Sequence, residues 1–131
     1  MISLEEMERR ILSELQEAGE ENIAALLNTV IEPADDMGQA YQLQQALRRL
    51  VQAEFAQMAL ARDRIAGLKP LTSDESLALI ENIPSTLEFQ GNKRRWAWAS
   101  GSTPQVVVTD AGQAQADKIL EEQGYQWWRQ S

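Results

Sequence analysis

The side chains with the clearest binding chemistry lie on one predicted helix, which begins near Asp36 and runs past residue 50. Steps of three and four residues place Gln42, Gln45 and Arg49 on one helical face, opposite an apolar face. A glutamine amide can bond to an adenine edge, and an arginine can bond to guanine or to a phosphate. The same pattern also fits the solvated face of an ordinary helix. The candidate binding residues of this segment are Gln39, Gln42, Gln45, Arg48 and Arg49.

A second candidate site is the basic run Lys93, Arg94 and Arg95, which follows a Gly-Asn turn and directly precedes Trp96. A basic hairpin tip with aromatic neighbours can hold a nucleic-acid backbone or stack on bases. The period-two alternation of Trp96 and Trp98 predicts instead that both tryptophans face the core, while the basic residues keep the hairpin soluble.

Enzyme chemistry finds little support in the sequence. The chain contains no histidine and no cysteine, which excludes Ser-His-Asp and Cys-His arrangements and the usual zinc sites. Pairs of neighbouring acids such as Glu5-Glu6 do not converge on one point of a helix. There is no calcium loop and no phosphate loop. We therefore expect no catalytic residue, no metal site and no cofactor.

The charge is strongly uneven along the chain. The 131 residues have a net charge of −8, and residues 1–36 alone hold ten acids and two bases. This balance argues against non-specific binding of nucleic acid by the molecule as a whole. The base-free segment before Arg48 weakens a DNA interpretation further. Seven of the twelve bases are Arg48, Arg49, Arg62, Arg64, Lys93, Arg94 and Arg95.

Length and apolar content predict one domain with its own core, spanning residues 1–131. There is no apolar run of the roughly 18 residues that a membrane span needs. The acidic, amphipathic N-terminus does not resemble a secretory signal. We therefore expect a cytoplasmic protein.

Capping signals and apolar periodicity predict helices over about 4–18, 21–31, 36–54, 73–83 and 110–123. Their predicted caps include Ser3, Asp36, Thr72 and either Thr109 or Asp110. Strand-like runs occupy about 55–62, where the helix could also continue, and 86–90, 95–100 and 105–109. The last three predict an antiparallel meander. The fold class is therefore α+β, and residues 63–93 are the least regular segment.

The order of these elements resembles a winged helix-turn-helix domain. The phrase Val108-Thr109-Asp110-Ala111-Gly112 is similar to the passage from the last wing strand into the final helix of MarR- and PadR-type regulators. The resemblance implies three N-terminal helices, a small antiparallel sheet and a C-terminal helix, with residues 63–93 as an insertion. Thr109 or Asp110 would cap the helix, and Gly112 would permit close approach to the sheet.

This resemblance implies a non-enzymatic transcriptional regulator that binds double-stranded DNA. The third helix would enter the major groove, and the basic hairpin would hold phosphates. The alternative is an acidic winged-helix module that binds proteins and not DNA. A continuous positive stripe joining Arg48 and Arg49 to residues 93–95 would favour DNA, and a broken stripe would favour protein. Tyr125, Trp127 and Trp128 either seal the core or form a dimer contact. We expect a homodimer whose terminal helices supply the contact.

Overall fold

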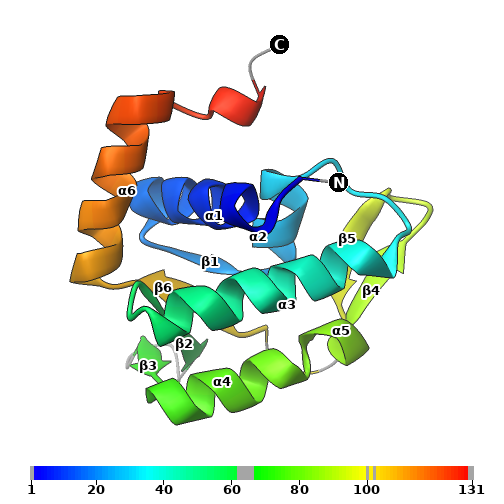
Figure 1. Ribbon diagram of the computed structural model, residues 1–131. Coiled ribbons are helices and arrows are strands. Elements are labelled where there is room, and N and C mark those ends of the chain that lie inside the picture. Colours follow the sequence, from blue (N-terminus) through cyan, green and yellow to red (C-terminus); the bar gives the residue numbers. More distant parts are fainter. Residues whose placement is uncertain (1, 62–66, 100, 102, 130–131) are drawn as a thin grey trace.

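A computed structural model describes residues 2–61, 67–99, 101 and 103–129, and confirms an α+β fold. It begins with helix α1 (Leu4–Ala18), short strand β1 (Glu20–Asn22), and helices α2 (Ile23–Val30) and α3 (Met37–Gln52). Strand β1 was not predicted, and α2 is correspondingly shorter than expected. Figure 1 shows α3 lying between α1 on one side and helix α4 (Ser73–Glu81) on the other.

The predicted caps begin these helices, although only one complete capping box forms in the described part of the chain. Ser3 Oγ accepts a hydrogen bond from the Glu6 N–H, and Asp36 Oδ1 accepts one from the Gly38 N–H. At α4, the Thr72 hydroxyl and the Glu75 carboxylate exchange bonds with each other's backbone N–H, which is the full box.

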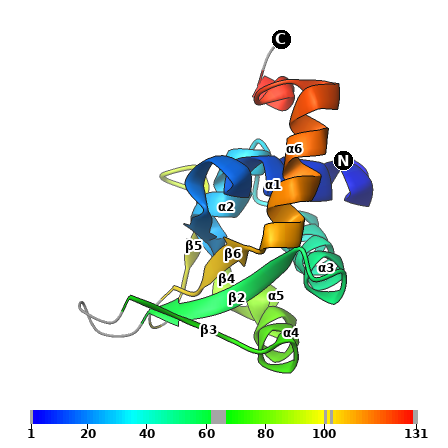
Figure 2. The same cartoon turned by 90° about the vertical axis from the view of Figure 1, so that its left-hand side faces the viewer.

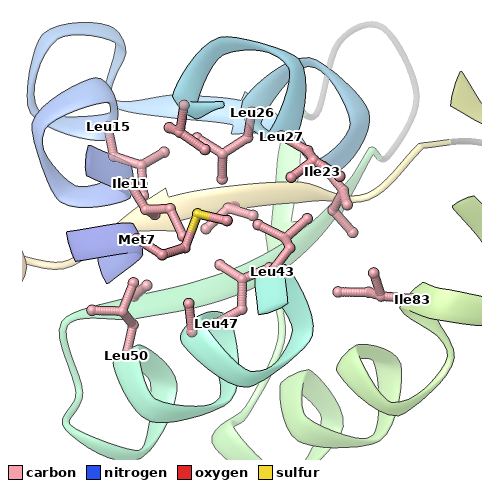
Figure 3. Close-up of a cluster of buried hydrophobic side chains, with 14 of the residues drawn as sticks. Met7, Ile11, Leu15, Ile23, Leu26, Leu27, Leu43, Leu47, Leu50 and Ile83 are labelled. Carbon is pink, nitrogen blue, oxygen red and sulfur yellow. The ribbon is translucent and has the colours of Figure 1, made fainter. Parts of the chain in front are cut away.

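The core forms where the apolar stripes of α1, α2 and α3 meet, as drawn in Figure 3. Met7, Ile11 and Leu15 are fully buried on α1, at the spacing of four residues that predicted this face. They pack with buried leucines of α2 and α3, among them Leu27 and Leu43. Burial of this apolar area is the main driving force for the arrangement of the three helices.

A four-stranded antiparallel sheet has the order β1-β6-β2-β3, with β2 (Ala56–Ala61), β3 (Leu68–Pro70) and β6 (Gln105–Val108). Strand β6 is therefore flanked by two strands from the first half of the chain. It pairs with β1 from Gln105 opposite Asn22, and with β2 from Val108 opposite Ala56. In Figure 2, β2 and β3 run away from the helices as a ribbon.

The predicted meander is wrong, because the last three strands divide between two sheets. Strands β4 (Leu87–Gln90) and β5 (Arg95–Trp98) form a separate hairpin, while β6 joins β1 and β2. In this arrangement β6 is hydrogen-bonded to a strand on each of its two edges, β1 and β2. Pro84 also does not end the helix of residues 73–83: α4 ends at Glu81, and Pro84 lies in the first turn of a second short helix, α5 (Ile83–Thr86).

The passage from β6 into helix α6 (Asp110–Gln123) is built as the sequence predicted. Thr109, rather than Asp110, caps the helix and accepts a hydrogen bond from the Gly112 N–H. A Cβ at Gly112 would lie 2.0 Å from the Phe55 carbonyl oxygen, so only glycine allows α6 to approach this closely.

None of the helices in the described part of the chain has the length and apolar content that a membrane span requires.

The C-terminal tail, which includes the 3₁₀ turn Trp127–Arg129, folds back onto α1 and α2. The Trp127 indole donates to Glu6 Oε2, and the Trp128 indole donates to the Thr29 carbonyl. Tyr125 bonds to Glu17 of α1. The half-buried Trp127 and Trp128 thus cover the chain's own helices, which is one of the two predicted roles, whereas Tyr125 is 54% exposed.

Candidate functional site

The side-chain amide of Gln39, at the start of α3, forms hydrogen bonds within the protein. Its Oε1 accepts hydrogen bonds from the Ala34 N–H at 3.0 Å and from the Trp96 indole at 2.9 Å. Its Nε2 donates to the Glu32 carbonyl at 3.0 Å. The side chain thus connects α3 to the preceding loop and to the β4–β5 hairpin. Both its Oε1 and its Nε2 already have hydrogen-bond partners within the protein.

The other two glutamines differ in their availability. Gln42 is half-buried and donates to the Ile2 carbonyl ahead of α1. Gln45 is exposed, one turn from exposed Tyr41. Only Gln45 of the three predicted glutamines therefore presents a largely solvent-facing side chain.

The two predicted arginines of α3 are paired with acids on opposite flanks of the helix. Arg48 forms an ion pair with Glu81 of α4 at 2.5 Å. Arg49 lies 2.7 Å from Glu8 and 3.7 Å from Glu5, both on α1. Both guanidinium charges are thus balanced within the protein. The acidic partners were not identified from the sequence, because they lie more than 30 positions away from the arginines.

The basic residues Lys93, Arg94 and Arg95 form the exposed tip of the β4–β5 hairpin, defined here as the basic tip. The backbone N–H groups of Lys93 and Arg94 both donate to the Gln90 carbonyl, and Arg94 adopts a positive φ of 55°. Within the described part of the chain, none of the three side chains forms an ion pair. The basic tip is therefore a cluster of unbalanced positive charge.

The basic tip and the arginines of α3 do not form one continuous stripe. The bond between Trp96 and Gln39 places the hairpin beside the first turn of α3, and Figure 1 shows β4 and β5 at that end of the helix. Arg48 and Arg49 lie about 14 Å further along the helix, given a rise of 1.5 Å per residue. Their charges are also balanced by Glu81 and Glu8. Arg62 and Arg64, two further bases predicted for this side, lie outside the described residues.

Trp96 is buried as predicted, with 2% of its surface exposed. Its ring meets Phe89 edge-on at a centroid distance of 5.5 Å. Trp98 packs against the same core but is only half-buried. Neither indole is therefore presented as an open stacking platform beside the basic tip.

Comparison with protein-family models, with curated proteins and with solved structures gives no match for this chain.

Proposed function

We propose that the chain is a winged helix-turn-helix domain that acts as a protein-interaction module. Three observations support the winged-helix part: three helices precede β2, β2 pairs antiparallel with β6, and β6 leads directly into α6. In this interpretation the β2–β6 pair is the base of the wing. The segment between its strands then carries β3, α4, α5, β4 and β5 as an insertion, longer than the sequence predicted.

The observation that carries the functional part is the internal pairing of both α3 arginines. A helix that enters a DNA groove draws much of its affinity from cations that neutralise phosphates. Arg48 and Arg49 would first have to leave Glu81 and Glu8. The unpaired basic tip offers its charge without this cost, so the favoured partner is an acidic protein segment that binds there.

A fluorescence titration at two salt concentrations tests this proposal. The probes are a labelled peptide rich in glutamate and aspartate, and a labelled random duplex DNA. The variant R94A/R95A should lose binding of the peptide. The matched variant K69A/K118A, which removes two exposed cations elsewhere, should retain it.

The salt dependence separates the two classes of partner. Three tip cations that contact phosphates give a log–log slope of at most about 2.7 on duplex DNA. A steeper slope, or peptide binding that survives R94A/R95A, would overturn the proposal. No peptide binding even at low salt would do the same.

DNA-binding regulation is the second candidate, favoured by the exposure of Gln45 together with the unpaired basic tip. If Gln45 reads a base edge, Gln45→Ala should cost about 1–3 kcal/mol on the preferred site and little on random DNA. R94A/R95A should then weaken binding to all duplexes alike, because phosphates carry no sequence information.

The homodimer stays a prediction in either case. Trp127 and Trp128 contact their own chain, so a dimer contact through the terminal helices would use the exposed faces of α1 and α6. Light scattering at micromolar concentration tests it, and a monomer mass alone would refute it.

A further inference from the structure

A half-open recess of about 340 Å³ lies between α1, the C-terminal end of α3 and α6. Its apolar lining includes Leu12, Leu50 and Ile119, each at most 5% exposed, and the half-buried Phe55. The charged lining comes from α1 and α3 and consists of Glu5, Glu8, Arg9 and Arg49. The lining is thus mixed, with Gln115 as a further polar member, and the volume falls within the range of sites for small organic molecules.

Glu8 is the unusual group of this recess. Its side chain is only 18% exposed, and its Oε1 is shielded from solvent. The Arg49 Nε lies 2.7 Å from that oxygen, yet its N–H does not point along a hydrogen bond, so Oε1 receives no hydrogen bond from the described residues. Burial raises the pKa of the Glu8 carboxyl above its usual range. Arg49 and Arg9 act against this shift, and Glu5 adds to it.

Arg49 can release Glu8 and still remain paired. The guanidinium also lies 3.7 Å from Glu5, whose side chain is 56% exposed. A cation that displaced Arg49 from the shielded Oε1 would give Glu8 a directed hydrogen bond, while Glu5 continued to balance Arg49. Charge-assisted hydrogen bonds of this kind are stronger than neutral ones.

We propose that this recess binds a small organic ammonium compound with an apolar body, its ammonium group on Glu8 and its body against Leu12, Leu50 and Ile119. The protein's net charge of −8 attracts cations to its surface. The lining holds two carboxylates and two arginines; both arginines already have acidic partners, whereas Oε1 of Glu8 receives no hydrogen bond from the described residues. The recess at the C-terminal end of α3 is a different surface from the basic tip, which lies beside the first turn of that helix.

Titration calorimetry with three matched probes tests the proposal: 4-phenylbutylamine, 4-phenylbutanol and 4-phenylbutyrate. The amine should bind saturably at a stoichiometry of one, and the alcohol and the acid should bind at least about tenfold more weakly, as expected for loss of a charge-assisted contact. Binding of the amine should strengthen as the pH rises through the raised pKa of Glu8, because the ionised carboxylate is the binding form.

Three variants locate the site and separate binding from folding. Glu8→Gln should weaken amine binding by about tenfold or more. The matched variant Glu81→Gln, which removes the acid paired with Arg48 on the other flank of α3, should leave it unchanged. Ala53→Phe adds a ring at an exposed lining residue and should block the recess while Glu8 stays intact.

Arg49→Ala gives the most discriminating result. A ligand that competes with Arg49 for Glu8 should bind more tightly to this variant, whereas a merely structural role of Arg49 predicts weaker binding. Equal binding of the three probes, or amine binding unchanged in both Glu8→Gln and Ala53→Phe, would overturn the proposal. Absence of amine binding to the folded wild-type protein would overturn it as well.

Discussion

The side-chain amide of Asn28 pairs with both backbone groups of Trp96. Its Nδ2 donates to the Trp96 carbonyl at 2.9 Å, and its Oδ1 accepts from the Trp96 N–H at 2.8 Å. An amide side chain on α2 thus takes the place of a neighbouring strand at the outer edge of β5. The pairing satisfies edge groups that would otherwise be open to another chain.

Replacing this amide should destabilise the protein. Asn28→Ala leaves the Trp96 N–H and carbonyl without their partner, and two lost hydrogen bonds should lower the free energy of unfolding by about 1–3 kcal/mol. Urea denaturation measures the effect. Asn92→Ala, at an exposed position of the hairpin turn, is the control and should change the stability little. Equal effects of the two substitutions would contradict the role given to Asn28.

Gly112→Ala should be among the most damaging single-methyl changes in the chain. The added Cβ would lie 2.0 Å from the Phe55 carbonyl oxygen and 2.8 Å from Val108 Cγ2, so α6 would have to shift away from the start of β2. We expect a loss of about 2–4 kcal/mol, as for severe overpacking. Gly91→Ala is the matched control, because a Cβ there meets nothing within 4 Å. Similar melting temperatures for both variants would show that the contact is easily relieved.

Glu14→Gln should stabilise the protein at neutral pH. Burial raises the pKa of Glu14; Arg129 opposes the shift, and Glu17 and Glu21 add to it. Because the folded state binds the proton more tightly than the unfolded state, stability is lost as the pH rises from about 4.5 through the raised pKa. The glutamine does not ionise, so its advantage should be present at pH 7 and vanish below pH 4.5.

Thermal unfolding across this pH range is the measurement. Glu122→Gln, at an exposed position of α6, serves as the control. An advantage of Glu14→Gln that is equally large at acidic pH would mean that ionisation is not its cause.

Trp127→Phe should loosen the tail. The substitution removes the indole N–H that donates to Glu6 Oε2 at 2.8 Å, while most of the apolar ring remains. A hydrogen bond to a charged acceptor contributes about 1.5–3 kcal/mol, and partial exposure places the expected loss at the lower end. Trp98→Phe is the matched control, since that half-buried indole makes no hydrogen bond among the described residues. Equal losses from both in urea unfolding would assign the effect to packing alone.

The local features of the fold could be read from the sequence. Ser3, Asp36, Thr72 and Thr109 all cap helices where predicted, because a cap depends on residues within three positions. Strand β1 could not be predicted, because Glu20–Asn22 has no strand pattern of its own and is extended only beside β6. The pairing of β6 with β2 rather than with β5 could not be predicted either, because it depends on contacts between strands that are far apart in the sequence.

The candidate site was predictable only as a set of residue types. Helical spacing correctly placed Gln45 and Arg49 at exposed positions of α3. Helical spacing could not show that the Trp96 indole, 57 positions away, donates a hydrogen bond to the Gln39 side chain, or that Glu81 forms an ion pair with Arg48. These partners depend on how the helices and the hairpin pack, which periodicity within one helix does not contain.

The position of β6 between β1 and β2 also has a consequence for protein synthesis. As the chain leaves the ribosome, α1, α2, α3 and β2 emerge long before residues 105–108, which bridge β1 to β2. The helical core can therefore collapse early, while the edges of β1 and β2 stay unpaired until the strand between them is made. Contacts over such sequence separations slow folding. Nascent chains that stop before residue 105 should thus be more sensitive to proteases than chains that include residues 105–108.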